Sequence, residues 1–168
     1  MDETIIRAGE PRDLPSVVGL VRALADFEKL PGPDDAAARR LADDFTAGHY
    51  SLLVAERDSA LVAERDSAIV GYALYFFTYS TFLARPSLYL EDLFVHPAAR
   101  GGGVGERFMR ALAKEAERRG CGRFEWTVLD WNVDAQKFYR RLGAEVLSSW
   151  WTCRVTGEGL KQLASSTP

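Results

Sequence analysis

The spacing of apolar residues predicts a chain in which strands and helices alternate. Segments dense in β-branched and aromatic residues are expected to be strands: 5–7, 51–56, 68–79, 88–95, 124–129 and 146–155. Apolar residues recur at helical spacing over 14–25, 104–119 and 132–142, and a more polar helix is expected over 34–47. Interleaved elements of this kind predict an α/β domain with a mixed sheet and helices on both of its faces. The length favours a single domain over residues 1–168.

An octapeptide is duplicated between two of the predicted strands. Residues 53–60 and 61–68 both read LVAERDSA. Two short copies do not make a solenoid, which needs longer and more numerous units. The duplication is expected to lengthen a hairpin, and since either copy can pair in the sheet, the sequence leaves the strand register open.

The composition narrows the class of partner. The formal net charge is −3 and no long basic run occurs, which argues against nucleic acid and is compatible with a cationic substrate. No apolar run reaches the roughly 20 residues that span a bilayer, and the acidic N-terminus lacks a signal region, so no membrane association and a cytoplasmic location are expected. Cys121 and Cys153 lie in different elements without metal-ligand spacing, which predicts free thiols and no metal site.

The strongest local signal is the segment RGGGVG at residues 100–105, between a predicted strand and a predicted helix. Glycines let main-chain N–H groups approach a ligand closely, and a helix N-terminus adds free N–H groups and a positive dipole end. Together they predict a site for a pyrophosphate. A glycine-rich turn without a ligand is the alternative, whereas the Gly-Lys-Ser/Thr of a P-loop is missing and the spacing differs from a dinucleotide fingerprint.

Two further groups could carry chemistry. Glu91 and Asp92 are adjacent on a predicted strand, so at least one carboxylate should face a covered side of the sheet and could act chemically. The alternatives are an edge strand or a salt bridge to a residue such as Arg100. Asn132 and Tyr139 are seven residues apart, which places both side chains on one helix face, and a tyrosine hydroxyl there could donate a proton to a leaving group. The alternatives are a helix N-cap for Asn132 and a packing role for Tyr139.

Taken in order, these residues resemble the GNAT superfamily of N-acetyltransferases. Residues 100–105 match its coenzyme A signature, Arg/Gln-x-x-Gly-x-Gly/Ala. The segments LADFEKL (24–30), YLED (89–92), VLDWN (128–132) and FYRRLGA (138–144) are similar to the diamine acetyltransferase branch, which includes the spermidine/spermine and thialysine enzymes. The resemblance extends over residues 5–164. It implies the GNAT fold, with a mostly antiparallel mixed sheet that splays apart at the coenzyme A site.

The resemblance also implies a role for each matching residue. Acetyl-CoA would be the co-substrate, contacted by the main chain of Leu93, Phe94 and Val95, by a pyrophosphate cradle at Arg100, Gly101, Gly102, Gly103, Val104, Gly105 and Glu106, and by Asn132, Asp134 and Ala135. Tyr139 would be the general acid that protonates the departing thiolate. Glu91 would be the general base, acting through water, and Phe27, Glu28 and Asp92 would hold the amine.

The acceptor expected from this branch is a small cationic amine. Polyamine-specific members carry an acidic residue after Phe-Thr-Tyr, whereas Ser80 follows Tyr79 here, which favours thialysine, lysine analogues or short diamines. Homodimers are common in the family, and Trp150 and Trp151 are candidates for the contact, with a packed core as the alternative for these two side chains. A protein or peptide N-acetyltransferase and a non-catalytic coenzyme A-binding module are the competing functions.

Overall fold

The computed structural model describes residues 4–58 and 67–165, which fall into two units, residues 1–127 and 128–168. The elements of the first unit are β1 (Thr4–Ala8), η1 (Pro11–Asp13), α1 (Leu14–Glu28), α2 (Asp35–Thr46), β2 (Ser51–Asp58), β3 (Ser67–Ser80), β4 (Arg85–Val95), η2 (Pro97–Ala99), α3 (Val104–Arg118) and β5 (Arg123–Trp126). The second unit contributes α4 (Val133–Arg141) and α5 (Gly157–Ser165). A single domain over residues 1–168 stays a prediction.

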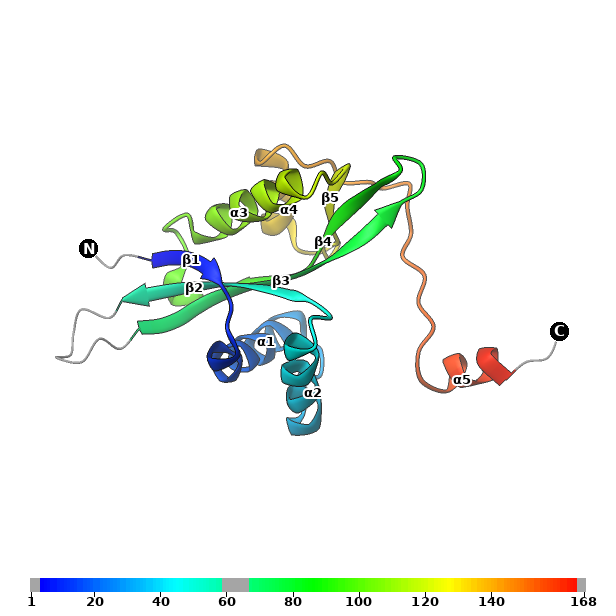
Figure 1. Cartoon of the computed structure of the whole chain (residues 1–168), viewed down its shortest axis with the longest axis horizontal. Helices are drawn as coiled ribbons and strands as arrows, with labels where there is room; N and C mark the ends of the chain where they lie inside the picture. Colours follow the sequence, from blue (N-terminus) through cyan, green and yellow to red (C-terminus); the bar gives the residue numbers. More distant parts are fainter. Residues whose placement is uncertain (1–3, 59–66, 166–168) are drawn as a thin grey trace. The chain divides into compact units, whose positions relative to one another are not determined.

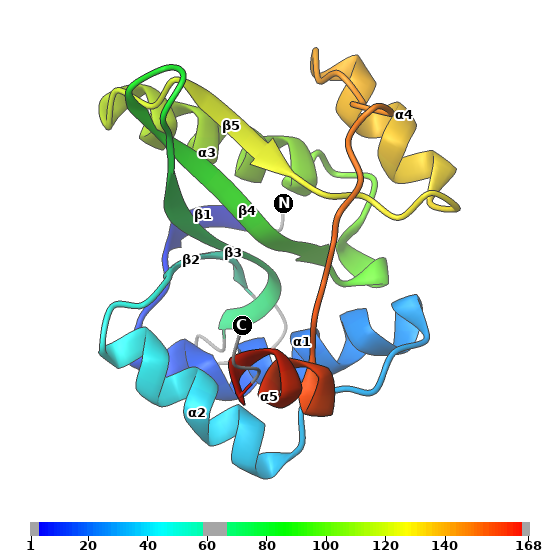
Figure 2. The ribbon, with the colours of Figure 1, turned by 90° about the vertical axis from the view of Figure 1, so that its right-hand side faces the viewer.

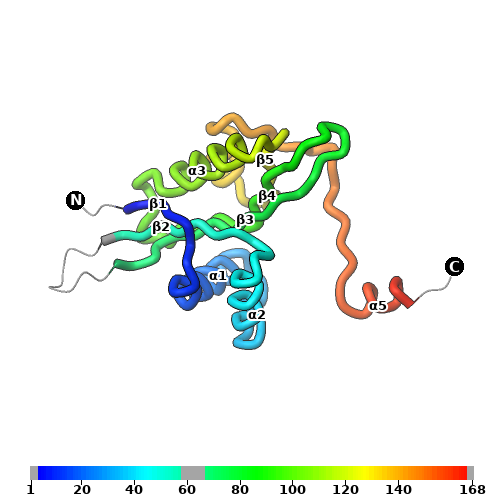
Figure 3. Tube along the Cα trace, viewed as in Figure 1, coloured from blue at the N-terminus to red at the C-terminus, as the bar shows by residue number. Residues whose placement is uncertain are grey.

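A five-stranded sheet in the order β1-β2-β3-β4-β5 forms the centre of the first unit. The first four strands pair antiparallel, and β4 pairs with β5 in parallel. The longest hairpin joins β3 to β4, as the chain trace in Figure 3 makes clear. The expected mixed, mostly antiparallel sheet is therefore confirmed.

Helices cover both faces of this sheet. In Figure 1, α1 and α2 lie on one side of the strands and α3 lies on the other. Proline at an early position suits the start of α1, because the missing N–H would have no partner there. Asp34 caps α2, since its side chain accepts a hydrogen bond from the Ala37 N–H at 2.7 Å. The predicted helices over 14–25, 34–47 and 104–119 are confirmed within a few residues.

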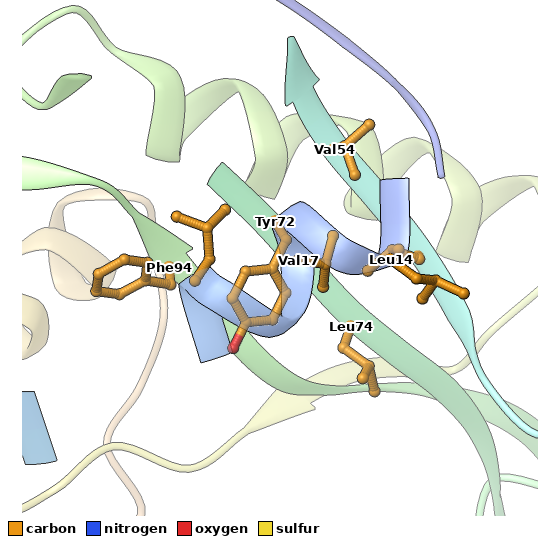
Figure 4. Packing of buried hydrophobic residues seen from close by; sticks show 8 residues of the cluster. Leu14, Val17, Val54, Tyr72, Leu74 and Phe94 are labelled. Atoms are coloured by element: carbon orange, nitrogen blue, oxygen red, sulfur yellow. The ribbon is translucent and has the colours of Figure 1, made fainter. Parts of the chain in front are cut away.

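The core on the α1 side is formed by apolar side chains from α1, β2, β3 and β4. Its buried members are Leu14, Val17, Leu20, Leu52, Val54, Tyr72, Leu74 and Phe94. Figure 4 shows Tyr72 in this cluster, with its ring between Phe94 and Val17 and its hydroxyl at the far end of the ring. A phenol hydroxyl is thus brought into an otherwise apolar layer, where it needs a hydrogen-bond partner.

On the other face, α3 packs through Val104, Phe108, Met109, Leu112 and Ala116. Residue 71 of β3 lies between this helix and the main chain of β4, so it has to be small. A Cβ on Gly71 would lie 2.9 Å from the Phe94 carbonyl oxygen and 3.2 Å from Cε2 of Phe108. Glycine is therefore needed in the middle of this strand.

The duplicated octapeptide contributes to the sheet through its first copy. Residues 53–58 belong to β2, where Leu53 lies opposite Ala73 of β3 and Ala8 of β1. The second copy contributes Ser67 and Ala68 to the start of β3, and its residues 61–66 lie outside the described part of the chain. The register that the sequence left open is thereby defined for the residues that the structure describes.

Two predicted strands at the C-terminal end need correction. The strand expected over 124–129 ends at Trp126, because main-chain hydrogen bonds from Asn132 to Leu129 and from Val133 to Trp131 turn the chain toward α4. No strand forms over 146–155, and the chain continues into α5 instead. A strand needs a partner, and the described residues 128–165 of this unit contain no other strand with which to pair.

Candidate active site

The sheet opens along the second half of β4. Its parallel ladder with β5 ends at the pair Leu90 and Trp126, whereas β4 itself continues to Val95. Figure 2 shows β5 beside the first part of β4 and ending before it. Among the described residues of this unit, no strand pairs with the free edge of β4 beyond Leu90. The splayed slot expected for the pantetheine arm corresponds to this edge.

A β-bulge lies where the opening begins, and its extra residue is Glu91. Leu74 of β3 lies opposite Asp92 and Tyr75 lies opposite Leu90, so Glu91 has no residue across from it. Successive strand residues point to opposite faces, and an extra residue reverses that alternation. Leu90 and Asp92 therefore face opposite sides of the sheet, and Glu91 is exposed at the bend between them.

Asp92 is the carboxylate that the bulge turns toward the covered face. It lies on the α1 side with Tyr72, which is fully buried and whose hydroxyl donates a hydrogen bond to Asp92 Oδ2 at 3.2 Å. Burial, and after it the negative charges of Glu91 and Glu28, raise the pKa of Asp92 to about 6, while the hydrogen bond from Tyr72 opposes the rise. The group is therefore ionised above pH 6 and can exchange a proton near neutrality.

The C-terminal end of α1 adds two predicted site residues to the same region. Glu28, half-buried, is the last residue of the helix, and Phe27 before it is 43% exposed. The helix stops here because Lys29 adopts a left-handed conformation, φ 58°, and donates its N–H to the last carbonyl groups. No ion pair with a lysine or arginine holds Glu28, Glu91 or Asp92 among the described residues. Three carboxylates without a countercharge make this region attractive to a cation.

The glycine turn between β4 and α3 is open. No atom of the described chain beyond the neighbouring residues lies within 4 Å of the position that a Cβ would take on Gly101, Gly102 or Gly103. Gly101 and Gly103 have φ of 85° and 73°, a conformation that favours glycine. The first-turn N–H groups of α3, at Val104, Gly105 and Glu106, have no acceptor within the helix. Bare amides at a helix N-terminus fit a pyrophosphate.

Arg100 links this turn to the acidic region. Its Nε donates to the Val95 carbonyl at 2.9 Å, and its guanidinium carbon lies 5.6 Å from the centre of the Phe94 ring and 5.9 Å from that of Phe27. Cation–π contacts of this length hold the turn against both β4 and the end of α1. The glycine turn and the carboxylates are therefore neighbours within one unit.

The three strand residues expected to contact the co-substrate differ in how their main chain is oriented. His96 donates its N–H to Val70 of β3, and main-chain groups alternate in direction along a strand, so those of Phe94 also face β3. Those of Leu93 and Val95 face the open edge, where the Val95 carbonyl already accepts from Arg100. The Leu93 amide and carbonyl, together with the Val95 N–H, are the groups that this edge offers to a ligand.

The second unit carries the remaining predicted site residues on α4. Asn132 precedes the helix, and its side chain accepts a hydrogen bond from the Ala135 N–H at 3.2 Å, so it is an N-cap. Asp134 lies in the exposed first turn, and the side chain of Gln136 donates to the Leu129 and Asp130 carbonyls before the helix. Asn132 thus has the structural role that the sequence analysis kept as an alternative.

Tyr139 is half-buried two turns into α4, with its ring centre 5.2 Å from that of Phe138. Burial raises its pKa to about 12, so the phenol keeps its proton at neutral pH. The helix ends at Arg141, and Gly143 just after the C-cap Leu142 has a φ of 92°, which suits a C-terminal capping position. The group can therefore serve as a proton donor, which is the chemistry that the sequence analysis expects of it.

Two observations change the sequence-based picture of the site. Tyr72 was not singled out, because nothing local marks a tyrosine on a buried strand as the partner of a carboxylate twenty residues away. Ser80 is buried at the far end of β3, where its Oγ accepts from the Leu83 N–H at 3.3 Å. Six residues of extended strand separate it from Leu74, the neighbour of Asp92, or about 20 Å. Within this unit, Ser80 does not contact the acidic region.

Metal-binding and membrane-spanning features are absent from the described residues. No group of three or more histidine, cysteine, aspartate or glutamate side chains in residues 4–58 and 67–165 is arranged to hold a metal ion. Over the same residues, no helix combines the length and the apolar character needed to cross a membrane. Cys121 and Cys153 are both free thiols.

Carboxylates beside an open glycine turn at a splayed β4 are an arrangement that suits an enzyme that transfers an acyl group to an amine. The profile of the acetyltransferase (GNAT) family matches residues 20–144. The chain therefore belongs to the GNAT family of acetyltransferases, enzymes that use acetyl-CoA.

Sequence identity to individual acetyltransferases indicates the branch of the GNAT family to which the chain is similar. The chain is 38% identical to the thialysine N-epsilon-acetyltransferase of Bos taurus over 165 residues, which cover 95% of this chain and 96% of that protein. It is 43% identical to the L-ornithine N5-acetyltransferase NATA1 of Arabidopsis thaliana over 93 residues, or 55% of this chain and 41% of that protein. The structure of an integron cassette protein of V. cholerae superposes with a TM-score of 0.76 at 26% identity, covering 97% of this chain and 98% of that one.

Proposed function

We propose that this enzyme acetylates the terminal side-chain amino group of thialysine, lysine analogues or short diamines. The observation that carries the proposal is the set of three carboxylates, Glu28, Glu91 and Asp92, which have no basic partner among the described residues and adjoin the open glycine turn. An alkylammonium with a pKa near 10.4 is attracted by such charges and must lose a proton before it attacks. The bovine relative is a thialysine N-epsilon-acetyltransferase and the plant relative an L-ornithine N5-acetyltransferase, both named for a side-chain nitrogen of an amino acid, which supports this acceptor class.

The co-substrate site is proposed at the free edge of β4 and the glycine turn. The N–H groups over residues 101–106 hold the pyrophosphate, and Leu93 and Val95 offer main-chain groups to the pantetheine arm. Acetyl-CoA, when bound there, supplies a thioester that an amine can attack. A main-chain N–H directed at the oxygen on which negative charge develops typically lowers such a barrier by about 3–4 kcal/mol.

We assign the acidic residues two roles toward the amine, binding of its charge and removal of its proton. Asp92 and Glu28 attract the ammonium group, with the exposed ring of Phe27 beside them. Glu91, exposed at the bulge, is the proposed base and receives the ammonium proton through water. Asn132, Asp134 and Ala135, at the start of α4, are the proposed further contacts of the co-substrate.

Tyr139 is the proposed general acid. The departing thiolate needs a proton, and a phenol with a pKa of about 12 carries one throughout the neutral range. Replacing Tyr139 with phenylalanine should lower kcat sharply while coenzyme A affinity, measured by calorimetry, stays nearly unchanged. An unaltered kcat would remove Tyr139 from the mechanism.

An acceptor screen tests the function. Thiol release from acetyl-CoA is followed with thialysine, lysine, ornithine, putrescine and spermidine, and each product is identified by mass spectrometry. The highest kcat/KM is expected for thialysine or another amino acid with a terminal amine. A clear preference for spermidine would overturn the proposed acceptor, and acetylation of a peptide in place of every small amine would overturn the small-molecule assignment.

A homodimer is also proposed. Trp150 and Trp151 are 79% and 88% exposed, and indole rings of this size are typically covered in an interface. Light scattering during gel filtration is expected to give twice the mass of one chain. Replacing both tryptophans with serine should shift the mass to that of a monomer.

A further inference from the structure

The hydroxyl of Tyr72 is a polar group that belongs to a residue of the apolar core. Its ring lies in the apolar cluster with Leu14, Val17 and Phe94, and the residue is fully buried (Figure 4). Nothing in the packing of that cluster requires a tyrosine, because phenylalanine would fill the same volume. The hydroxyl donates a hydrogen bond to Asp92 Oδ2 at 3.2 Å.

The register of the sheet explains how the two side chains meet. Tyr72 lies opposite Phe94, and Asp92 precedes Phe94 by two residues on the same face. Diagonal neighbours of this kind are within reach of an aromatic side chain. The bulge at Glu91 is what brings Asp92 to this face, so Tyr72 and the bulge act on the same carboxylate.

We infer that Tyr72 is a positioning residue, whose hydroxyl holds Asp92 ionised and aimed at the amine. The inference rests on the proposed function and adds a residue to it. Tyr72 itself is buried beneath the site and does not touch the reacting atoms.

The electrostatic surroundings show why Asp92 needs this support. Glu28 at the end of α1 and Glu91 on β4 both disfavour its charge, as does its burial. The guanidinium of Arg100 lies over the ring of Phe94, the next residue on this face, and forms no ion pair with Asp92. Within the described residues, the hydrogen bond from the Tyr72 hydroxyl on β3 is what stabilises the charged carboxylate. Its removal must therefore raise the pKa of Asp92.

The test compares the pH dependence of kcat/KM for wild type, Tyr72→Phe and Tyr75→Phe with one amine. Tyr75 lies on the same strand, is also buried, and faces the α3 side, so its variant is a matched loss of one hydroxyl. The amine loses its proton at the same pH in all three assays, so a difference between the profiles comes from a group of the enzyme. The acid limb of Tyr72→Phe is expected about one unit above that of wild type. At pH 8.5 and above, the two profiles should converge, and Tyr75→Phe should show no shift.

A second readout separates this inference from the proposed function. The carboxyl carbon of Asp92 is titrated by NMR in the protein without substrates. The same upward shift is expected in Tyr72→Phe, even if none of the amines proves to be a substrate. A carboxyl titration that is identical in wild type and Tyr72→Phe would overturn the inference, as would a uniform loss of kcat/KM at every pH.

Discussion

Replacing Asp92 with asparagine is predicted to stabilise the fold at neutral pH, although the change removes a proposed site residue. Asparagine has nearly the same shape, and its side-chain oxygen can still accept the hydrogen bond from Tyr72. What disappears is a negative charge that is half-buried and lies near Glu28 and Glu91. The native protein therefore loses a repulsion that the unfolded chain does not feel.

The magnitude follows from the pKa of Asp92, which rises from its ordinary value of 3.8 to about 6. Because the folded protein binds this proton more tightly than the unfolded chain does, the contribution of Asp92 to wild-type stability is greatest below pH 4 and falls as pH rises to 6. At about 1.4 kcal/mol per unit, the loss amounts to about 3 kcal/mol above pH 6. Asp92→Asn does not lose this free energy, so the difference in stability between the variant and wild type should become constant above pH 6.

Urea unfolding of wild type and Asp92→Asn at pH 4, 5, 6 and 7.5 measures the effect directly. The two free energies of unfolding should be similar at pH 4 and differ by up to about 3 kcal/mol in favour of Asp92→Asn at pH 7.5. The same variant should lose most of its kcat/KM for the amine. An Asp92→Asn protein that is less stable than wild type at pH 7.5, or whose advantage does not change with pH, would refute the reasoning.

Further predictions concern the glycines and the ion pair of β1. In urea unfolding, Gly71→Ala should destabilise the fold by about 2 kcal/mol, because the new Cβ would lie 2.9 Å from the Phe94 carbonyl oxygen. Gly19→Ala should stabilise the fold by about 0.5–1 kcal/mol, because Gly19 lies in helix α1 with open space around its Cβ position. Gly102→Ala should leave thermal stability unchanged and weaken coenzyme A binding in calorimetry at least tenfold, and equal affinity would exclude this turn as the cradle. Asp13→Asn should lower the free energy of unfolding by about 3 kcal/mol near neutral pH, because the partly buried guanidinium of Arg7 on β1 loses the carboxylate to which it donates two hydrogen bonds. The pKa of Asp13 is lowered by that contact, so the destabilisation should be present at pH 7 and shrink as pH falls below 4.

The sequence predicted the parts of the fold that depend on local pattern. Helix α3 was expected from its apolar spacing, and its start from the preceding glycines, since a positive φ at Gly103 is a property of that residue alone. The strand expected over 146–155 was wrong because strand formation depends on a partner, which the composition of a segment does not reveal.

The sequence could propose the candidate site as a set of residues and not as an arrangement. Alternation along a strand indicated that Glu91 or Asp92 faces a covered side, and the bulge decides which one does. A bulge is a mismatch between two strands, so it cannot be seen in either strand alone. The partnership of Tyr72 with Asp92 depends on the same long-range register, and the resemblance that marked Asp92 carried no information on its buried neighbour.

The acceptor assay tests the central claim most directly. Wild-type protein is supplied with acetyl-CoA and either thialysine or spermidine at matched concentrations, and released thiol and the acetylated amine are measured together. The account predicts stoichiometric thiol release and acetyl transfer, with the greater kcat/KM for thialysine. The absence of thiol release with both amines, in a protein that binds coenzyme A, would contradict it.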